Sequence, residues 1–301
     1  MAAAAMTHPQ LRGELRYNEP MASHVSWRAG GRARCYFVPA DLDDVAVLLA
    51  TLPVNEKVLW HGLGSNTLVR DGGFNGTVIA AQGIMQELER VENYRVYAGS
   101  GVTSAKLARF CARTNLVGAE FFAGIPGLVG GALAMNAGAF GGETWRHVIE
   151  VKTIDRQGRR HTRNADEYKI GYRHAEGPAN EWFAAALFQF EAGDGEQAAA
   201  GVKALLARRA QTQPTGTANC GSVFVNPDND HAARLIEACG LKGRRIGGAV
   251  VSEKHANFII NDSNACANDI EDLIELVQQT VEQQQGVSLR TEVRIVGEKR
   301  A

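Results

Sequence analysis

The feature that most constrains the fold of this chain is a long stretch, between residues 124 and 141, that carries almost no side chains. Its two parts read Gly124-Ile125-Pro126-Gly127-Leu128-Val129-Gly130-Gly131-Ala132 and, three residues later, Asn136-Ala137-Gly138-Ala139-Phe140-Gly141. Backbone without side chains can turn tightly and lie directly against a ligand. The stretch therefore predicts a site where a large, flat molecule contacts the main chain. Tight packing without any ligand is the alternative.

A second glycine segment, Gly62-Leu63-Gly64-Ser65-Asn66, follows a predicted buried strand at residues 58–60. It lacks the third glycine and the adjoining helix of a dinucleotide-binding Rossmann turn. Successive N–H groups in a turn form an anion-binding hollow, so this segment and its serine hydroxyl are suited to holding a diphosphate. A plain tight turn is the alternative interpretation.

Charge and cysteine content exclude several classes of protein. Thirty-two basic residues balance 33 acidic ones without a dense basic cluster, so nucleic acid is not an expected partner. The five cysteines include no Cys-x-x-Cys pair, which argues against a disulfide framework and against a metal site. No stretch approaches the ~18 apolar residues of a membrane span. We therefore expect a cytoplasmic protein that binds neither nucleic acid nor metal nor membrane. We also expect a monomer, although the sequence itself does not give the oligomeric state.

Hydrophobic periodicity predicts an α+β fold, in which helices and strands first alternate and strands then dominate. The main predicted elements are helices at 42–52 and 104–114, strands at 148–154, 159–163 and 183–191, helices at 194–213 and 232–239, a helix from Asn268 with Glu271 completing its start signal, and a strand at 289–296.

The two glycine segments together resemble the FAD-binding domain of the p-cresol methylhydroxylase and vanillyl-alcohol oxidase (PCMH/VAO) superfamily. The amino-acid sequence of residues 124–127 and 136–139 is similar to that of one branch of this superfamily, the UDP-N-acetylenolpyruvoylglucosamine reductases or MurB family. Further matches follow in that family's order at Tyr172-Arg173, Gly221-Ser222-Val223-Phe224-Val225-Asn226-Pro227, Glu253-Lys254-His255-Ala256-Asn257-Phe258 and Glu292-Val293-Arg294. They run from about Arg28 to the last strand, and the chain looks like the shorter, type II branch.

This resemblance implies an FAD-binding PCMH/VAO-type domain of two lobes, followed by a C-terminal α+β substrate-binding domain. We expect a flexible N-terminal tail at 1–20, the FAD domain at 21–195 with lobes at about 21–85 and 86–195, and the substrate domain at 196–301. The last strand of that domain would return to the active site.

The resemblance also implies the chemistry. FAD would be bound non-covalently, NADPH would be the co-substrate, and UDP-N-acetylglucosamine enolpyruvate would be reduced to UDP-N-acetylmuramate for peptidoglycan synthesis. The expected cofactor-binding residues are Gly62, Gly64, Ser65, Asn66, Gly124, Ile125, Pro126, Gly127, Gly130, Gly131, Asn136 and Gly138.

The same resemblance assigns three catalytic residues. Arg173 would hold the substrate carboxylate, Glu292 would lie beside it, and Ser222 would give a proton to substrate C2. Each also has a plainer interpretation: Arg173 as a surface ion-pair donor, Ser222 as the start of a strand and Glu292 as an exposed strand residue. The expected substrate-binding residues are Tyr172, Asn226 and Lys254.

Two positions depart from the family's pattern. Val225 stands where a lysine is usual, so Lys254 and Asn226 would carry more of the contact to the substrate. Cys220 stands where alanine is common, and we expect it at the mouth of the substrate pocket, open to alkylation.

Two other functions stay open. One is an FAD-dependent oxidase or dehydrogenase of the same superfamily that acts on an alcohol or sugar, although His61 lies just outside the glycine segment, which favours a non-covalent flavin. The other is a nucleotide-sugar-binding protein without catalysis.

Overall fold

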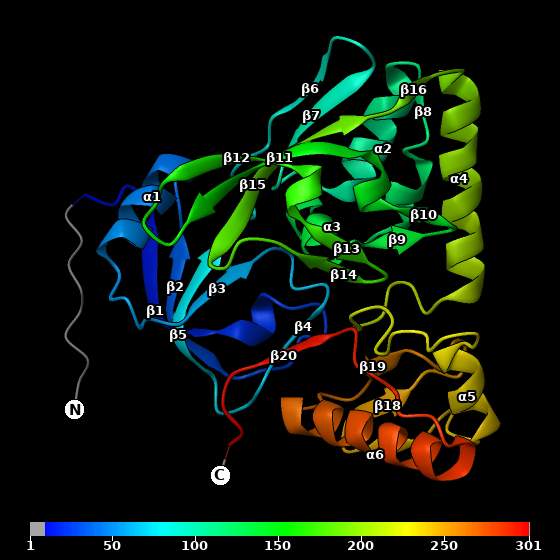
Figure 1. Cartoon of the computed structure of the whole chain (residues 1–301). Coiled ribbons are helices and arrows are strands. Elements are labelled where there is room, and N and C mark those ends of the chain that lie inside the picture. Colours follow the sequence, from blue (N-terminus) through cyan, green and yellow to red (C-terminus); the bar gives the residue numbers. More distant parts are fainter. Residues whose placement is uncertain (1–9, 301) are drawn as a thin grey trace.

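The computed structural model, which describes residues 10–300, is built around three larger sheets with their covering helices. Figure 1 shows two sheet-containing lobes above and to the left, and a smaller domain below them at the lower right. The catalytic residues expected from sequence lie where these three units meet.

The first lobe is built on a four-stranded sheet in the spatial order β1-β2-β5-β3, where β1 and β2 are antiparallel and the other pairs are parallel. Helix α1 (Leu42–Thr51) covers it and buries Val45, Leu48 and Leu49 against the sheet. The strands are β1 (Glu14–Pro20), β2 (Arg32–Val38), β3 (Val58–His61) and β5 (Phe74–Ala80).

The second lobe is built on a five-stranded antiparallel sheet in the order β12-β11-β15-β7-β6. Its strands are β6 (Leu88–Val91), β7 (Arg95–Gly99), β11 (Val148–Asp155), β12 (Arg160–Asn164) and β15 (Glu181–Gln189). Its helices are α2 (Ser104–Arg113), α3 (Val129–Met135) and α4 (Gly195–Thr212). Val202 of α4 lies in the core of this lobe, so the helix expected to begin the substrate domain packs with the second lobe instead.

Short strand pairs and single-turn helices complete the second lobe. They are β8 (Leu116–Val117) with β16 (Glu191–Ala192), β9 (Gly138–Ala139) with β10 (Gly142–Glu143), β13 (Lys169–Gly171) with β14 (His174–Glu176), and the 3₁₀ turns Glu120–Gly124, Thr144–His147 and Ala165–Glu167. A further 3₁₀ turn, Met21–Ser23, belongs to the first lobe.

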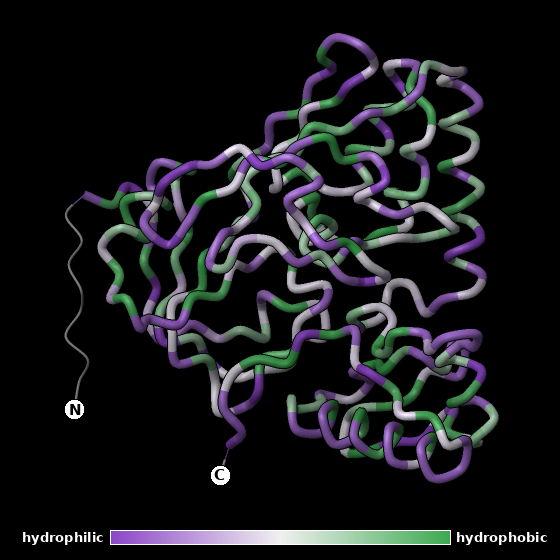
Figure 2. Tube along the Cα trace, viewed as in Figure 1, coloured by the Kyte–Doolittle hydropathy of each residue, from purple (hydrophilic) through white to green (hydrophobic). Residues whose placement is uncertain are grey.

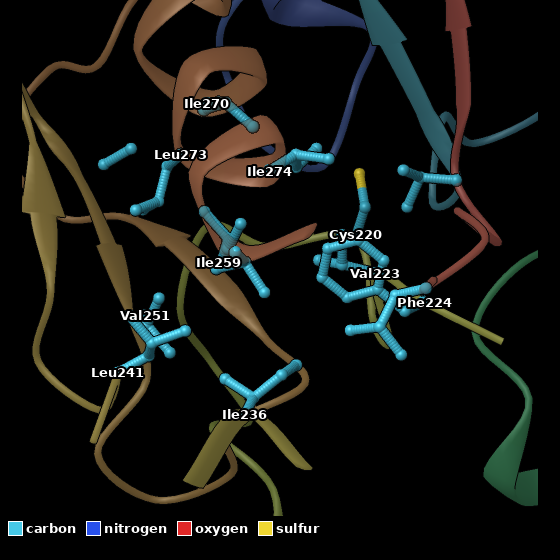
Figure 3. Close-up of a cluster of buried hydrophobic side chains, with 14 of the residues drawn as sticks. Cys220, Val223, Phe224, Ile236, Leu241, Val251, Ile259, Ile270, Leu273 and Ile274 are labelled. Carbon is cyan, nitrogen blue, oxygen red and sulfur yellow. The ribbon is translucent and has the colours of Figure 1, made fainter. Parts of the chain in front are cut away.

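The C-terminal domain contains a small antiparallel sheet and two helices. Its elements are α5 (Ala232–Ala238), β17 (Arg245–Ile246), β18 (Ala249–Val251), β19 (Ile259–Asn261) and α6 (Ala267–Gln285). The inner face of α6 buries Ile270, Leu273 and Ile274 in the cluster shown in Figure 3. Its tube in Figure 2 therefore changes between green and purple from turn to turn, as expected of a half-buried helix.

Three contacts tie the C-terminal domain to the first lobe. Asp71 accepts hydrogen bonds from the first backbone N–H groups of α6, at 3.1 and 2.9 Å. Arg70 forms a two-pronged ion pair with the buried Glu271. The last strand, β20 (Arg294–Val296), returns to pair in parallel with β4 (Thr67–Val69) (Figure 1). The segment before β20 is thereby fixed next to the glycine segment that precedes β4.

Three expectations about local structure are wrong. Residues 14–20, assigned to a tail, form β1, while residues 1–9 of that tail lie outside the described part. Helix α6 begins at Ala267, because Cys266 and Asp269 form the reciprocal capping pair expected at Asn268 and Glu271. The last strand is limited to its final three residues. Within residues 10–300, no helix is both long and apolar enough to cross a membrane.

Candidate active site

A cavity of about 770 Å³ lies between the two lobes and the C-terminal domain. Both glycine segments and the side chains of Arg173, Ser222 and Glu292 line it. One wall is thus main chain and the facing wall carries polar side chains.

The short glycine segment connects β3 to β4 and offers a run of free donors. The backbone N–H groups of residues 62–66 donate no hydrogen bond to any acceptor within residues 10–300. Gly64 has φ +61°, and a Cβ there would lie 2.3 Å from the carbonyl oxygen of His24. The turn therefore requires glycine and presents N–H groups suited to an anion.

The long glycine segment lies beside the short one. The Ser65 hydroxyl donates to the carbonyl of Pro126 at 3.0 Å, which joins the two segments. Gly127 has φ +122°, whereas a Cβ on Gly131 would meet no atom within 4 Å. Gly131 is therefore open to the cavity, and a bound molecule can approach the start of α3 without displacing protein atoms.

Two asparagines expected to bind cofactor use their side chains in the protein framework. Asn66 donates from its side chain to the backbone carbonyl of Glu292 at 3.0 Å, so it links the glycine segment to the last strand. Asn136 ends α3 in the left-handed conformation and donates to the carbonyl of Gly171 at 2.9 Å. It is buried and does not line the cavity, so its predicted contact with cofactor is not supported.

Arg173 is carried by a tight hairpin. Tyr172 and Arg173 form the two-residue turn between β13 and β14, and Arg173 has the left-handed φ of 55°. That conformation is strained for a residue with a side chain, and it directs the arginine into the cavity. Its guanidinium donates to the carbonyl of Gly138 at 2.9 Å and lies over the ring of Tyr172.

Glu292 contacts Arg173 in the lining of the cavity, with Oε1 of the glutamate 3.2 Å from Nε of the arginine. The two side chains are 18% exposed each. Burial raises the pKa of Glu292 above its ordinary value, and the positive charge of Arg173 opposes that rise only in part. The backbone N–H of Glu292 donates to Val223 at 2.8 Å, which fixes its distance from the Ser222 segment.

Ser222 lies in a short loop held by a buried amide. Asn257 accepts from the backbone N–H of Phe224 and donates to the carbonyl of the same residue, and its own carbonyl accepts from Val223. No group in the described part of the chain hydrogen-bonds the Ser222 hydroxyl, which lines the cavity. The hydroxyl is therefore free to meet a ligand.

The three expected substrate-binding residues do not form one group. The amide of Asn226 donates to the hydroxyl of Tyr172 at 3.3 Å, so these two meet across the boundary between the second lobe and the C-terminal domain. Lys254 instead donates to the backbone carbonyl of Ala210, and none of the three lines the catalytic cavity.

The expectation for Cys220 is wrong in its exposure. Cys220 lines the cavity, but its thiol is 3% exposed and contacts the carbonyls of Gly64 and Thr67. Burial raises its pKa to about 12, so it is not the reactive thiolate that alkylation needs. Figure 3 shows it within the same cluster as Val223 and Phe224. Val225 is buried too, which suits an apolar residue better than the lysine usual there.

Sequence reasoning gave no role to two cations that line the cavity, Arg209 and Arg294. Arg209 belongs to the polar helix α4, where nothing in the pattern separates it from its exposed neighbours. His61 also lines the cavity, and its ring bonds the carbonyl of His24, while burial lowers its pKa. Among the described residues, no group of three or more metal-ligating side chains is present.

Two comparisons with protein families agree with this geometry. Residues 33–163 match the FAD binding domain, and residues 213–296 match the C-terminal domain of UDP-N-acetylenolpyruvoylglucosamine reductase. The open glycines and the free N–H groups lie in or beside the first match, and they fit a bound FAD.

Individual relatives cover almost the whole chain. A UDP-N-acetylenolpyruvoylglucosamine reductase of Alkalilimnicola ehrlichii is 56% identical over 99% of both chains. One of Legionella pneumophila is 54% identical over 96% of this chain and 94% of its own. The solved structure of the enzyme from Thermus caldophilus is 27% identical, with a TM-score of 0.80 over 95% of this chain and 99% of the other. The chain belongs to the UDP-N-acetylenolpyruvoylglucosamine reductase family.

Proposed function

We propose that this protein reduces UDP-N-acetylglucosamine enolpyruvate to UDP-N-acetylmuramate with NADPH and FAD, as the name of its family implies. The observation that carries this is the convergence of Arg173, Glu292 and Ser222 on one cavity that also contains the amide-lined glycine segments. Fold alone would not distinguish the reductase from an oxidase, but this polar triad suits a substrate with a carboxylate and a carbon that needs a proton.

FAD, when bound, supplies the redox chemistry, since it can accept a hydride from NADPH and deliver one to the enolpyruvyl group. We assign its diphosphate to the N–H groups of residues 62–66 and to the open backbone at Gly127 and Gly131. No acidic side chain belongs to either glycine segment, so the diphosphate meets no fixed negative charge there.

Arg173 and Glu292 stabilise the negative charge of the substrate carboxylate. The planar guanidinium can hold a carboxylate through two parallel hydrogen bonds, and its bond to the Gly138 carbonyl fixes its plane. Negative charge grows toward that carboxylate as hydride reaches substrate C3. Burial raises the pKa of Glu292, and whenever its carboxyl carries a proton it can donate a hydrogen bond to that charge.

Ser222 is the proton donor to substrate C2 in this proposal. Its hydroxyl has no partner within the described residues, and the buried Asn257 holds the loop that carries it. A hydroxyl is a weak acid, so it serves only where the receiving carbon is strongly basic, as an enolate-like carbon is. Tyr172 and Asn226, which meet across the domain boundary, would contact the UDP part.

The proposal also covers the location, the oligomeric state and the domain division of the protein. We assign a cytoplasmic monomer with two FAD-binding lobes, divided near residue 85, and a substrate domain. We place the boundary of the substrate domain near Gln213 and not at 195, because α4 packs into the second lobe and the C-terminal family match begins at 213.

The decisive experiment separates the two halves of the reaction. Under anaerobic conditions NADPH should bleach the yellow flavin, and UDP-N-acetylglucosamine enolpyruvate should restore the colour with formation of UDP-N-acetylmuramate. If air restores the colour rapidly but the UDP-sugar does not, the protein is an oxidase of the same superfamily. If NADPH leaves the flavin yellow, the proposed electron donor is wrong.

A further inference from the structure

The hairpin that carries Arg173 has little of its own to hold it in place. It is a separate two-stranded sheet of β13 and β14, with three residues in each strand, and most of their side chains are exposed. An isolated two-stranded hairpin is only marginally stable in water. The positive φ of Arg173 adds strain, which persists only where neighbouring structure fixes it. The direction of Arg173 therefore depends on contacts from outside the hairpin.

The guanidinium of Arg173 makes few polar contacts that could fix it. Within residues 10–300 its one hydrogen bond runs from Nη2 to the carbonyl of Gly138, at 2.9 Å. Its Nε is buried and pairs with Glu292 at 3.2 Å without the geometry of a hydrogen bond. Two backbone positions thus determine where the guanidinium points, namely the turn that carries Arg173 and the carbonyl of Gly138.

Asn136 is bonded to the first of these positions. Its Nδ2 donates to the carbonyl of Gly171, the residue directly before the turn, at 2.9 Å, and to a carboxylate oxygen of Glu143 at 3.3 Å. Its Oδ1 accepts from the backbone N–H of Trp145 at 3.1 Å. The side chain is 1% exposed, so the amide cannot turn away without leaving buried polar groups unpaired. The end of α3 thereby holds the base of the Arg173 hairpin.

The same residue also affects the second position. Asn136 ends α3 in the left-handed conformation, with φ 44°, and two residues later the chain presents the Gly138 carbonyl to Arg173. Between them, the carbonyl of Ala137 accepts from the backbone N–H and the hydroxyl of Thr144, at 3.0 and 2.7 Å. Asparagine adopts this conformation more readily than most residues that have a Cβ. One residue therefore connects both backbone positions that direct the guanidinium.

We propose that Asn136 is a positioning residue for Arg173, whose amide holds the hairpin so that the guanidinium points at the substrate carboxylate. It is not a catalytic residue, because it is buried behind the cavity and does not line it. The inference rests on the proposed function for the role of Arg173. The part that concerns the hairpin can be measured without turnover.

Two substitutions separate the amide from the backbone conformation. Asn136→Gly removes the amide but suits the positive φ, so the turn at the end of α3 should still form. Asn136→Asp keeps the shape but places an oxygen opposite the Gly171 carbonyl and the Glu143 carboxylate, which both repel it. Asn115→Gly is the matched control, because Asn115 also has positive φ, follows α2 in the same lobe and does not line the cavity.

We expect both Asn136 variants to keep their flavin and its bleaching by NADPH. The rate at which UDP-N-acetylglucosamine enolpyruvate restores the colour should fall by about 10- to 100-fold, because a displacement of about 1 Å at a reacting group can cost that much. The loss should appear in kcat and not in KM, since the charge that Arg173 stabilises grows only during the reaction. In the Arg173→Lys background the same substitutions should have little further effect, because residues that act through one another are not additive.

Hydrogen exchange, read by mass spectrometry on the flavin-loaded proteins, tests the hairpin without turnover. Residues 169–176 should exchange faster in Asn136→Gly than in the wild type and in Asn115→Gly, while β11 and β15 should be unchanged. Failure of the wild type to reduce the UDP-sugar would refute the proposed function. Faster exchange of the hairpin in Asn136→Gly would still support its anchoring by Asn136.

The proposal is overturned if the Asn136 variants keep the rate of the second step within twofold of the wild type, or if only KM rises. It is overturned too if their effect is as large in the Arg173→Lys background as in the wild type, or if exchange of the hairpin is unchanged. Loss of the fold in both variants, seen by circular dichroism, would also overturn it, because the amide would then serve folding as a whole.

Discussion

The two walls of the catalytic cavity are made in opposite ways. The cofactor wall consists of main chain from two glycine segments, joined by one hydrogen bond from Ser65 to Pro126. The facing wall consists of three side chains from three separate parts of the chain: a hairpin turn, a loop of the C-terminal domain and a residue two positions before β20. A wall of backbone depends on where side chains are absent, whereas a wall of side chains depends on which ones are present. Substitutions should therefore damage the two walls differently.

The largest effect is expected for Gly64→Ala. The new Cβ would lie 2.3 Å from the His24 carbonyl on a backbone of positive φ, so the turn must move. We expect a loss of about 2–4 kcal/mol of folding stability, measured by urea unfolding. Gly83→Ala is the control, because Gly83 also has positive φ but no atom within 4 Å of the new Cβ. Equal stability of the two variants would show that the turn is not tightly packed.

Gly131→Asp should abolish the cofactor site without unfolding the protein. Its Cβ meets no protein atom, and an acidic residue is favourable in the first turn of α3, so the fold should persist. Its charge would enter the space we assign to the diphosphate. We expect colourless protein with a normal circular dichroism spectrum, while Gly131→Ala keeps its flavin. A yellow Gly131→Asp enzyme with normal turnover would refute the assignment of this wall to FAD.

On the facing wall, Ser222→Ala should have the largest effect. General acid assistance contributes ~10² to 10⁴ in rate, and we expect a loss of that size in the reduction of the enolpyruvyl substrate by NADPH-treated enzyme. Bleaching by NADPH should be unchanged, and Ser222→Cys should retain part of the activity. Stopped-flow absorbance separates the two steps, with the exposed Ser263→Ala as control. A near-normal rate in the second step would mean that another group donates the proton.

Arg173→Lys should lower turnover by about 10², because an ammonium cannot replace the two-pronged contact to a charge that develops only during reaction. The exposed Arg146→Lys is the matched control. Steady-state kinetics gives the answer: a rise in KM with unchanged kcat would make Arg173 a binding residue and not a catalytic one.

The smallest effect concerns stability and pH. Since burial raises the pKa of Glu292, the folded state binds its proton more tightly than the unfolded state does. Folding stability should therefore fall as pH rises from the ordinary glutamate pKa through the raised one. Glu292→Gln should flatten this part of the pH profile in urea unfolding, and the exposed Glu275→Gln should not. An unchanged slope would contradict the effect of burial.

The cofactor wall was the more predictable of the two. Missing side chains are visible in the sequence, and the positive φ of Gly64 and Gly127 explains why glycine is required there. The catalytic residues were named through resemblance, because no periodicity shows that Arg173 and Glu292 approach to 3.2 Å. Burial was the harder property to predict: Cys220 lies two residues before Ser222 in sequence, yet its thiol points to backbone carbonyls in the core.

Helix caps and domain contacts were missed for a similar reason. Asp71 caps α6 although 196 residues separate it from the helix start, and local sequence patterns carry no signal for such a partner. Lys254 belongs to a motif expected to line the site, but its ammonium group donates a hydrogen bond to the backbone carbonyl of Ala210. A motif therefore shows which residues are neighbours in the sequence. Tertiary packing determines which of their side chains contact the ligand.

The return of β20 to β4 has a consequence for protein synthesis. Chains grow from the N-terminus and domains fold largely as units, so the two lobes can fold while the ribosome still holds the C-terminal residues. Glu292 and β20 join β4 only after those last residues emerge, across more than 200 positions of sequence. The nascent chain is therefore expected to acquire its flavin site before its catalytic wall, and premature termination before Glu292 should leave a yellow but inactive product.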